Sequence, residues 1–352
     1  MKNFLYSNGY ASTFDPLGVK WFFVLLAFLL VPSAALAQDD DNTQSEGTLL
    51  IVPRLDLDPA WNAGDGWSFD LGTTSLYTLF EGNLTRNLSF SISNHWFSYC
   101  TGWDDAADLY RNTWRSDATN WVDWINLTYK IGNFFLSAGK DYMRIANFEI
   151  EEYDYDSHWQ MNSHLWNTFQ VYQWGGRLGW QSEDEDLTLS LQVTTDPGMS
   201  RPFEVAHPLF YAYTFNTFYE GETLQLMGSV THSASWGWIG AAGAKVALSD
   251  ALALGTDINV SEKVKSGSLR LDAALSDKME LIAKLGYEWG YLVEGGHLYG
   301  GLACNWYPLR DSHDLRVHLM AAPSYVKYSY GDKATDLYFS AGATWFFEFQ
   351  LF

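Results

Sequence analysis

Apolar and polar side chains alternate with a period of two along most of this chain of 352 residues. The segment 278–289 (KMELIAKLGYEW) places Leu281, Leu285 and Tyr287 on one face and Glu280, Lys284 and Glu288 on the other. Successive side chains of a strand point to opposite faces, whereas a helix repeats every 3.6 residues. The pattern therefore predicts β-strands with one apolar and one polar face.

The length of the alternating segments distinguishes two kinds of all-β protein. Strands of soluble sandwiches usually run about 5–6 residues, whereas strands that cross a membrane need about 9–11. Most segments here reach the longer range, which favours an all-β transmembrane antiparallel β-barrel of about 16 strands, with 14 or 12 as alternatives. The expected strands are 47–56, 67–85, 88–98, 120–131, 133–142, 166–181, 186–196, 207–219, 222–233, 235–247, 251–261, 266–275, 278–290, 296–306, 313–328 and 335–351.

The connections between these segments also fit a barrel. Every second connection is tight, such as Arg86-Asn87 and Gly132, whereas the alternate set contains the long ones, 99–119 and 143–165. Short turns at one rim and longer loops at the other are expected of a bacterial barrel. The final expected strand, 335–351, is followed by Phe352, which is out of phase with the apolar face, and a bulge near the end of the strand would restore the phase.

The N-terminus predicts export from the cytoplasm. Lys20 precedes an apolar run, 21–31 (WFFVLLAFLLV), and an Ala35-Leu36-Ala37 exit, which together are typical of a cleaved secretory signal peptide over 1–37. Residues 38–46 (QDDDNTQSE) are expected to form an acidic periplasmic tail. The barrel is expected over 47–352, in the cell outer membrane of a Gram-negative bacterium.

Charge and aromatic content restrict the partners of the mature chain. Without 1–37, which contain Lys2, Lys20 and Asp15, the chain keeps 19 basic and 41 acidic side chains, a net charge of −22. That charge excludes nucleic acid as a partner, since its phosphates require a basic surface. Aromatic residues make up 17% of the chain, and the girdles at the two edges of a membrane barrel would accommodate them. Cys100 and Cys304 are interpreted as free, although the sequence alone leaves a disulfide bridge open.

Three stretches resemble the phosphate-selective porin family (the O and P type) and Bacteroidota-like porins: 79–93 (LFEGNLTRNLSFSIS), 125–144 (INLTYKIGNFFLSAGKDYMR) and 305–319 (NWYPLRDSHDLRVHL). The resemblance implies a sixteen-stranded barrel in the outer-membrane lipid bilayer, often a homotrimer. It does not extend to phosphate selectivity, because the clustered arginines and lysines which that property needs are depleted here.

Two sets of charged residues are candidates for the pore. The loop 143–165 is the third long connection, and in sixteen-stranded porins that loop commonly folds inward and forms the constriction. Its carboxylates are Glu149, Glu151, Glu152, Asp154 and Asp156; the alternative is a solvated loop at the cell surface. The opposing basic set, inward by parity or near the pore mouth, is Lys140, Arg144, Arg270, Lys278, Lys284 and Arg316.

The expected function is passive diffusion of small hydrophilic solutes or ions, with a preference for cations, because sixteen strands leave an aqueous channel. One alternative is a transporter for hydrophobic compounds, which would need an N-terminal plug and an apolar lumen. A second is a structural or surface-binding barrel whose loops block the pore. We expect no enzymatic activity, because no G-x-S-x-G element supports a Ser-His-acid group on the wall. The scattered histidines show no zinc spacing, so neither metal nor cofactor is expected.

Overall fold

The computed structural model describes residues 46–71, 74–104, 109–115, 122–151, 159–163, 165, 171–197, 211–290, 293–309, 312–327 and 333–351. Their elements are β1 (Glu46–Asn62), β2 (Gly66–Asp70), β3 (Ser75–Thr85), β4 (Leu88–Asp104), β5 (Leu109–Arg115), β6 (Val122–Ile131), β7 (Phe134–Tyr142), α2 (Phe148–Glu151), η1 (Trp159–Met161), β8 (Tyr172–Gln181), β9 (Leu187–Thr195), β10 (Tyr211–Glu220), β11 (Leu224–Ser233), β12 (Gly237–Ser249), β13 (Leu252–Ser261), β14 (Lys265–Ser276), β15 (Met279–Gly290), β16 (Val293–Trp306), β17 (Leu315–Lys327), β18 (Lys333–Trp345) and β19 (Phe347–Gln350).

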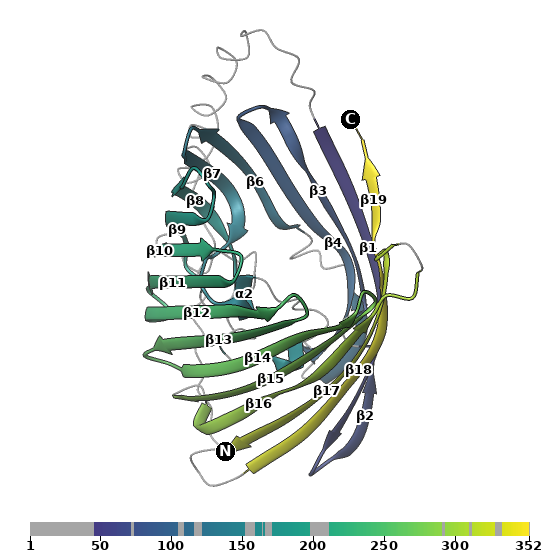
Figure 1. Ribbon diagram of the computed structural model, residues 1–352. Helices are drawn as coiled ribbons and strands as arrows, with labels where there is room; N and C mark the ends of the chain where they lie inside the picture. The colour runs from purple at the N-terminus through teal and green to yellow at the C-terminus, as the bar shows by residue number, and fades with distance from the viewer. Residues whose placement is uncertain are drawn as a thin grey trace. The chain divides into compact units, whose positions relative to one another are not determined.

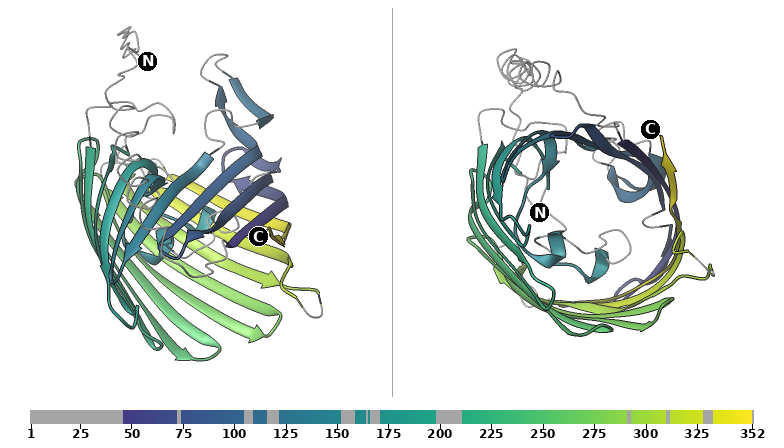
Figure 2. Two further views of the ribbon diagram at one scale, coloured as in Figure 1. Left: turned by 90° about the horizontal axis from the view of Figure 1, so that it is seen from above. Right: turned by 45° about the horizontal axis from the view of Figure 1, so that its top comes forward.

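The strands form one closed antiparallel barrel (Figures 1 and 2). Each strand of the barrel wall pairs with the next along the chain, and β1 closes the ring because it pairs with β3 on one side and with β18 and β19 on the other. The barrel has sixteen strands, as the sequence predicts, when β18 and β19 are counted as one interrupted strand and β2 and β5 as extensions of the wall. Closure removes the free edges of the sheet.

Two extra hairpins extend the wall on the side of the long connections. β2 folds back on the end of β1, and β5 folds back on the end of β4. The sequence predicts a single strand over 67–85, but the structure divides it between β2 and β3. At the division the Thr74 hydroxyl donates to the carbonyls of Asp56 and Leu71 and accepts from the Asp56 N–H, at 2.6–3.1 Å. A side chain therefore replaces the backbone ladder there.

The two faces of the wall differ as the alternation predicts. In β15, Leu285 and Trp289 are 60% and 48% exposed on the outer face, whereas Lys284 and Glu288 are buried on the inner face. Cys304 is a free thiol whose strand neighbours in register are Leu281 and Leu319. Among the described residues, no helix is long and apolar enough to cross a membrane.

The last strand of the barrel, formed by β18 and β19, shows no bulge in its described part. β18 stops at Trp345 and β19 begins at Phe347, yet the register with β1 is continuous, since Arg54 faces Thr344 and Ile51 faces Phe347. The bulge that would bring Phe352 into phase is therefore absent from the described residues up to Gln350, and Trp345, Phe347 and Phe349 stay on one exposed face. Phe352, the expected signal peptide (1–37) and residues 38–45 of the expected acidic tail lie outside the described residues, whereas Glu46, the last residue of that tail, begins β1.

Candidate functional site

The third long connection folds into the barrel. Figure 2 (right) shows α2 and η1 inside the ring of strands. The N–H of Ala146 donates to Ser229 Oγ at 3.0 Å, and the Asn147 amide donates to Asn259 Oδ1 at 2.7 Å. Because these partners belong to the inner face of β11 and β13, the loop is held against that wall by specific hydrogen bonds.

The carboxylate of Asp257 on β13 holds the start of α2. It accepts from the backbone N–H of Phe148 at 2.7 Å and of Glu149 at 3.3 Å. The first N–H groups of a helix have no partner within the helix and carry partial positive charge, so a carboxylate there is a favourable cap. Asp257 is 3% exposed, and its role depends on a partner 109 residues away along the chain.

Apolar packing completes the docking of the loop. Phe148 and Ala146 bury against Met227 of β11. Further along, loop side chains join apolar groups from the inner wall in two clusters, which contain Met143, Ile145, Leu165, Trp236, Ile239 and Val264 in one, and Met161, Ile282, Ala303 and Met320 in the other. The inner face is therefore not uniformly polar, and its apolar patches lie where the loop covers them.

The sequence predicts that Glu149 faces the water-filled lumen, but the structure buries its side chain. Its carboxylate is almost fully buried and forms an ion pair with Lys284 Nζ at 2.5 Å. The same carboxylate accepts from the N–H and the hydroxyl of Ser163, both at 2.6 Å. Glu149 thus joins the two described parts of the loop to β15, and its charge is neutralised by Lys284.

Of the two described loop carboxylates, Glu151 is the one that faces open space. Its Oε2 accepts from the Tyr142 hydroxyl at 2.7 Å and from Arg144 Nη1 at 3.0 Å. The Arg144 guanidinium lies 3.7 Å from the centroid of the Tyr142 ring, a cation–π contact. Glu152, Asp154 and Asp156 lie outside the described residues.

The six basic residues predicted for the pore lie in different environments. Arg144 borders the open space, whereas the other five contact the wall, the loop or a turn. Lys140 Nζ donates to the Val122 carbonyl, Arg270 Nε to Asp272, and Lys278 Nζ to the Leu309 carbonyl, while Lys284 pairs with Glu149 and Arg316 covers the Phe346 ring. Lys278 lies in the β14–β15 turn, at the rim of short connections.

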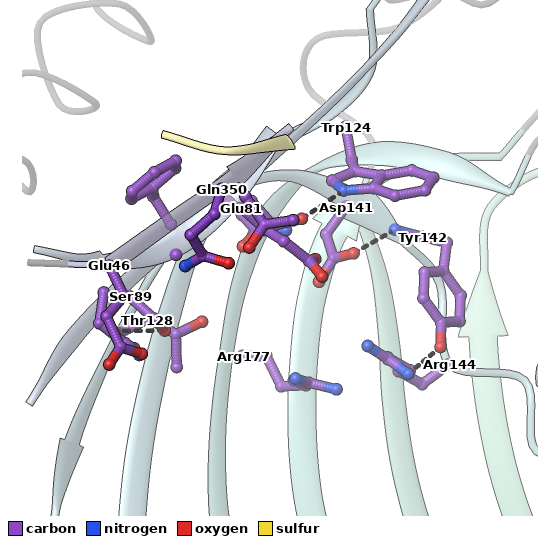
Figure 3. Close-up of a pocket in the computed structure, with 16 residues that line it drawn as sticks. Glu46, Glu81, Ser89, Trp124, Thr128, Asp141, Tyr142, Arg144, Arg177 and Gln350 are labelled. Atoms are coloured by element: carbon purple, nitrogen blue, oxygen red, sulfur yellow. Dashed lines mark hydrogen bonds between the residues drawn. The ribbon is translucent and has the colours of Figure 1, made fainter. Parts of the chain in front are cut away.

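Two cavities occupy the part of the lumen that the loop leaves open. One of about 560 Å³ is bordered by Glu46, Glu81 and Asp141, and one of about 320 Å³ by Lys130 and Glu151. Arg144, Arg177 and Thr128 line both, so the cavities meet at this group. Figure 3 shows the guanidinium groups of Arg144 and Arg177 next to each other below Asp141.

Sequence reasoning missed Arg177, although its signal was available. In β8 it shares its parity with the buried Gln173, opposite the exposed Trp174 and Leu178. Its guanidinium stacks on Phe135 at 4.9 Å and interacts electrostatically with Arg144. The charges at the junction of the cavities are therefore mixed, with two arginines beside two carboxylates. Among the described residues, no group of three His, Cys, Asp or Glu could hold a metal ion.

The comparisons agree on the fold. No family model and no curated protein matches the chain. Solved structures do: the outer membrane channel DcaP of Acinetobacter baumannii (TM-score 0.59, 10% identity, 88% of this chain and 99% of that one) and an anion-selective porin from Comamonas acidovorans (0.61, 10%, 86% and 100%). A mutant of the porin of Rhodopseudomonas blastica also matches (0.54, 11%, 85% and 100%). At such identities the similarity establishes the fold, a porin-like β-barrel.

Proposed function

We propose that this chain is an outer-membrane channel for the passive diffusion of small hydrophilic solutes. The observation that carries the proposal is a closed sixteen-stranded barrel with an apolar outer face, whose lumen keeps two cavities with charged residues in their lining beside an inward-folded loop. Sixteen strands are enough for an aqueous channel. The fold shared with DcaP and two porins supports the same function and an outer-membrane location. A homotrimer remains a prediction.

The path for solutes runs beside the docked loop. The apolar clusters of the loop cover the inner face from β10 to β17, whereas the wall of the larger cavity comes from β1, β3, β4, β6, β7, β8 and β19. Solutes would be selected by the width left beside the loop and by the charges at the junction of the cavities. At physiological salt the screening length is about 8 Å, so only charges close to the path bias permeation.

The sign of the charge selectivity depends on the groups that line the two cavities rather than on the net charge of −22. Arg144 and Arg177 border both cavities; Glu46, Glu81 and Asp141 border the larger one, and Lys130 and Glu151 the smaller one. The described lining gives no support for the cation preference expected from the sequence, and one structural neighbour is an anion-selective porin. Loop carboxylates 152–156 lie outside the described residues, so a cation preference remains a prediction that a reversal potential would test.

The two alternatives predict different electrical behaviour. A transporter for hydrophobic compounds would need an apolar passage, yet charged and polar groups line the larger cavity. A barrel blocked by its loops would insert into a bilayer without conducting.

Single-channel recording of the refolded protein in a planar bilayer distinguishes these functions. We expect stepwise, ohmic conductance that scales with the salt concentration, because ions cross an aqueous path. Folded protein that inserts but passes no current would contradict the proposal and favour the blocked barrel. The control is the same preparation left unfolded in denaturant, which should produce no steps.

A further inference from the structure

Three side chains on neighbouring strands form a hydrogen-bonded chain at one end of the barrel. His297 of β16 lies between Glu288 of β15 and Ser324 of β17: its Nδ1 is 2.6 Å from Glu288 Oε1, and its Nε2 is 2.9 Å from Ser324 Oγ. An ionised carboxylate only accepts hydrogen bonds, so Nδ1 carries the proton in neutral imidazole. Nε2 is then the acceptor, and Ser324 donates its hydroxyl proton to it.

The three hydrogen-bonded side chains face the lumen. Glu288 is fully buried, whereas its neighbours in the sequence, Tyr287 and Trp289, point outward. Ser324 belongs to the buried face of β17, and the His297 side chain is 13% exposed. The group is close to a rim, because Glu288 is two residues before the end of β15 and Ser324 three before the end of β17. A solute would have to reach Ser324 past the partly exposed ring of His297.

A second histidine in the same barrel shows that this order of groups is not a general consequence of the packing. His318 also has an acid and a serine nearby, but Asp56 Oδ1 (3.1 Å) and Ser340 Oγ (3.3 Å) both approach its Nε2. Its Nδ1 has no hydrogen-bond partner among the residues that the structure describes. One nitrogen cannot be oriented by the acid and also take the proton of the serine, so His318 cannot relay a proton.

We propose that Glu288, His297 and Ser324 form a hydrolytic site for small, water-soluble carboxylic esters that enter the lumen. Ser324 Oγ attacks the ester carbonyl carbon while His297 Nε2 takes the hydroxyl proton, and Glu288 stabilises the imidazolium. The C–O bond to the alcohol breaks, and His297 returns the proton to the leaving alkoxide. Water then attacks the acyl-serine by the same route, which releases the carboxylic acid and restores Ser324.

The placement of the group determines the substrate class. Because its side chains face the lumen and the adjacent outward positions are the exposed Tyr287 and Trp289, the acyl chain of a bilayer lipid cannot reach Ser324 from the membrane. An ester is favoured over an amide because an alkoxide leaves more easily than an amine anion. The activity would be additional to diffusion, and it goes beyond the expectation from sequence that the chain has none.

The test uses full-length refolded protein in detergent, with p-nitrophenyl acetate as substrate and a fluorophosphonate as probe of the nucleophile. We expect hydrolysis to fall at least about 100-fold, to the background of the buffer, in Ser324→Ala and in His297→Asn, the range that a positioned general base contributes. Ser340→Ala, the matched control at the non-relaying histidine, should keep wild-type hydrolysis. Mass spectrometry should place the phosphonyl group on Ser324.

Folding of each variant is checked separately by the shift of the unheated band on a gel and by single-channel conductance. Hydrolysis by the wild type no faster than by a folded Ser324→Ala variant would overturn the proposal. So would probe labelling of Ser340 and other serines to the same extent as Ser324 in the wild-type protein, a result that does not depend on any variant folding.

Discussion

The Glu149–Lys284 ion pair gives the most specific prediction about the loop. Glu149→Ala removes the carboxylate that accepts from Ser163 and pairs with Lys284, and leaves the buried ammonium with Asn162 Oδ1 at 3.0 Å and the face of Tyr299. Removal of one partner of a buried pair costs about 3–5 kcal/mol. Since about 1.4 kcal/mol is a factor of ten, the docked state of the loop should lose roughly 10²- to 10⁴-fold in population relative to the undocked state.

Hydrogen exchange followed by mass spectrometry measures this loss directly. In Glu149→Ala the loop amides of Ala146, Phe148 and Ser163, which donate to wall or loop acceptors, should exchange much faster, while amides of the barrel ladder stay protected. The double variant Glu149→Ala/Lys284→Met should regain much of the protection, because it leaves no buried charge without its counter-charge. Unchanged exchange in Glu149→Ala, or exchange in the double variant as fast as in the single one, would refute the reasoning.

Three further predictions concern the wall, the path and the N-terminus. Leu285→Arg, on the outer face, should destabilise folding into lipid vesicles by roughly 2–4 kcal/mol if it lies near the bilayer midplane; its control, Glu280→Arg, should cost little, and equal costs would contradict the face assignment. Replacement of both Arg144 and Arg177 by Gln should shift the zero-current potential in a KCl gradient toward cation preference, and an unchanged potential would place them off the path. N-terminal sequencing of the membrane form should begin at Gln38; an intact leader would contradict the predicted cleavage.

The wall of the barrel could be predicted from the sequence because each strand carries its own evidence. Alternation is local, so Lys284 and Asp257 are recognisable as inward residues without knowledge of their partners. β5 is not predicted because its sequence, LYRNTWR, has no uniformly apolar face; in the structure it pairs with the end of β4. The split between β2 and β3 depends on the hydroxyl of Thr74, which a pattern of polarity does not distinguish from other polar groups.

The docking of the loop could be predicted in outline but not in detail. Its position as the third long connection and its acidic composition predict the fold into the lumen. Which carboxylates face water depends on pairs distant in sequence: Glu149 finds Lys284 across 135 residues, and Asp257 reaches the start of α2 across 109. The sequence contains no signal for such pairs. Replacement of Glu149 should therefore disturb the docking of the loop as well as remove a charge.

Swelling of proteoliposomes in sugars of increasing size tests the central claim, passive diffusion of small hydrophilic solutes, most directly. The account predicts rapid swelling in a pentose or hexose, a steep fall between a disaccharide and a trisaccharide, and no saturation with concentration, since the path is a water-filled space narrowed by the loop. The same vesicles without protein should not swell. Vesicles with folded, inserted protein that swell no faster than these, even in the smallest sugar, would contradict the account.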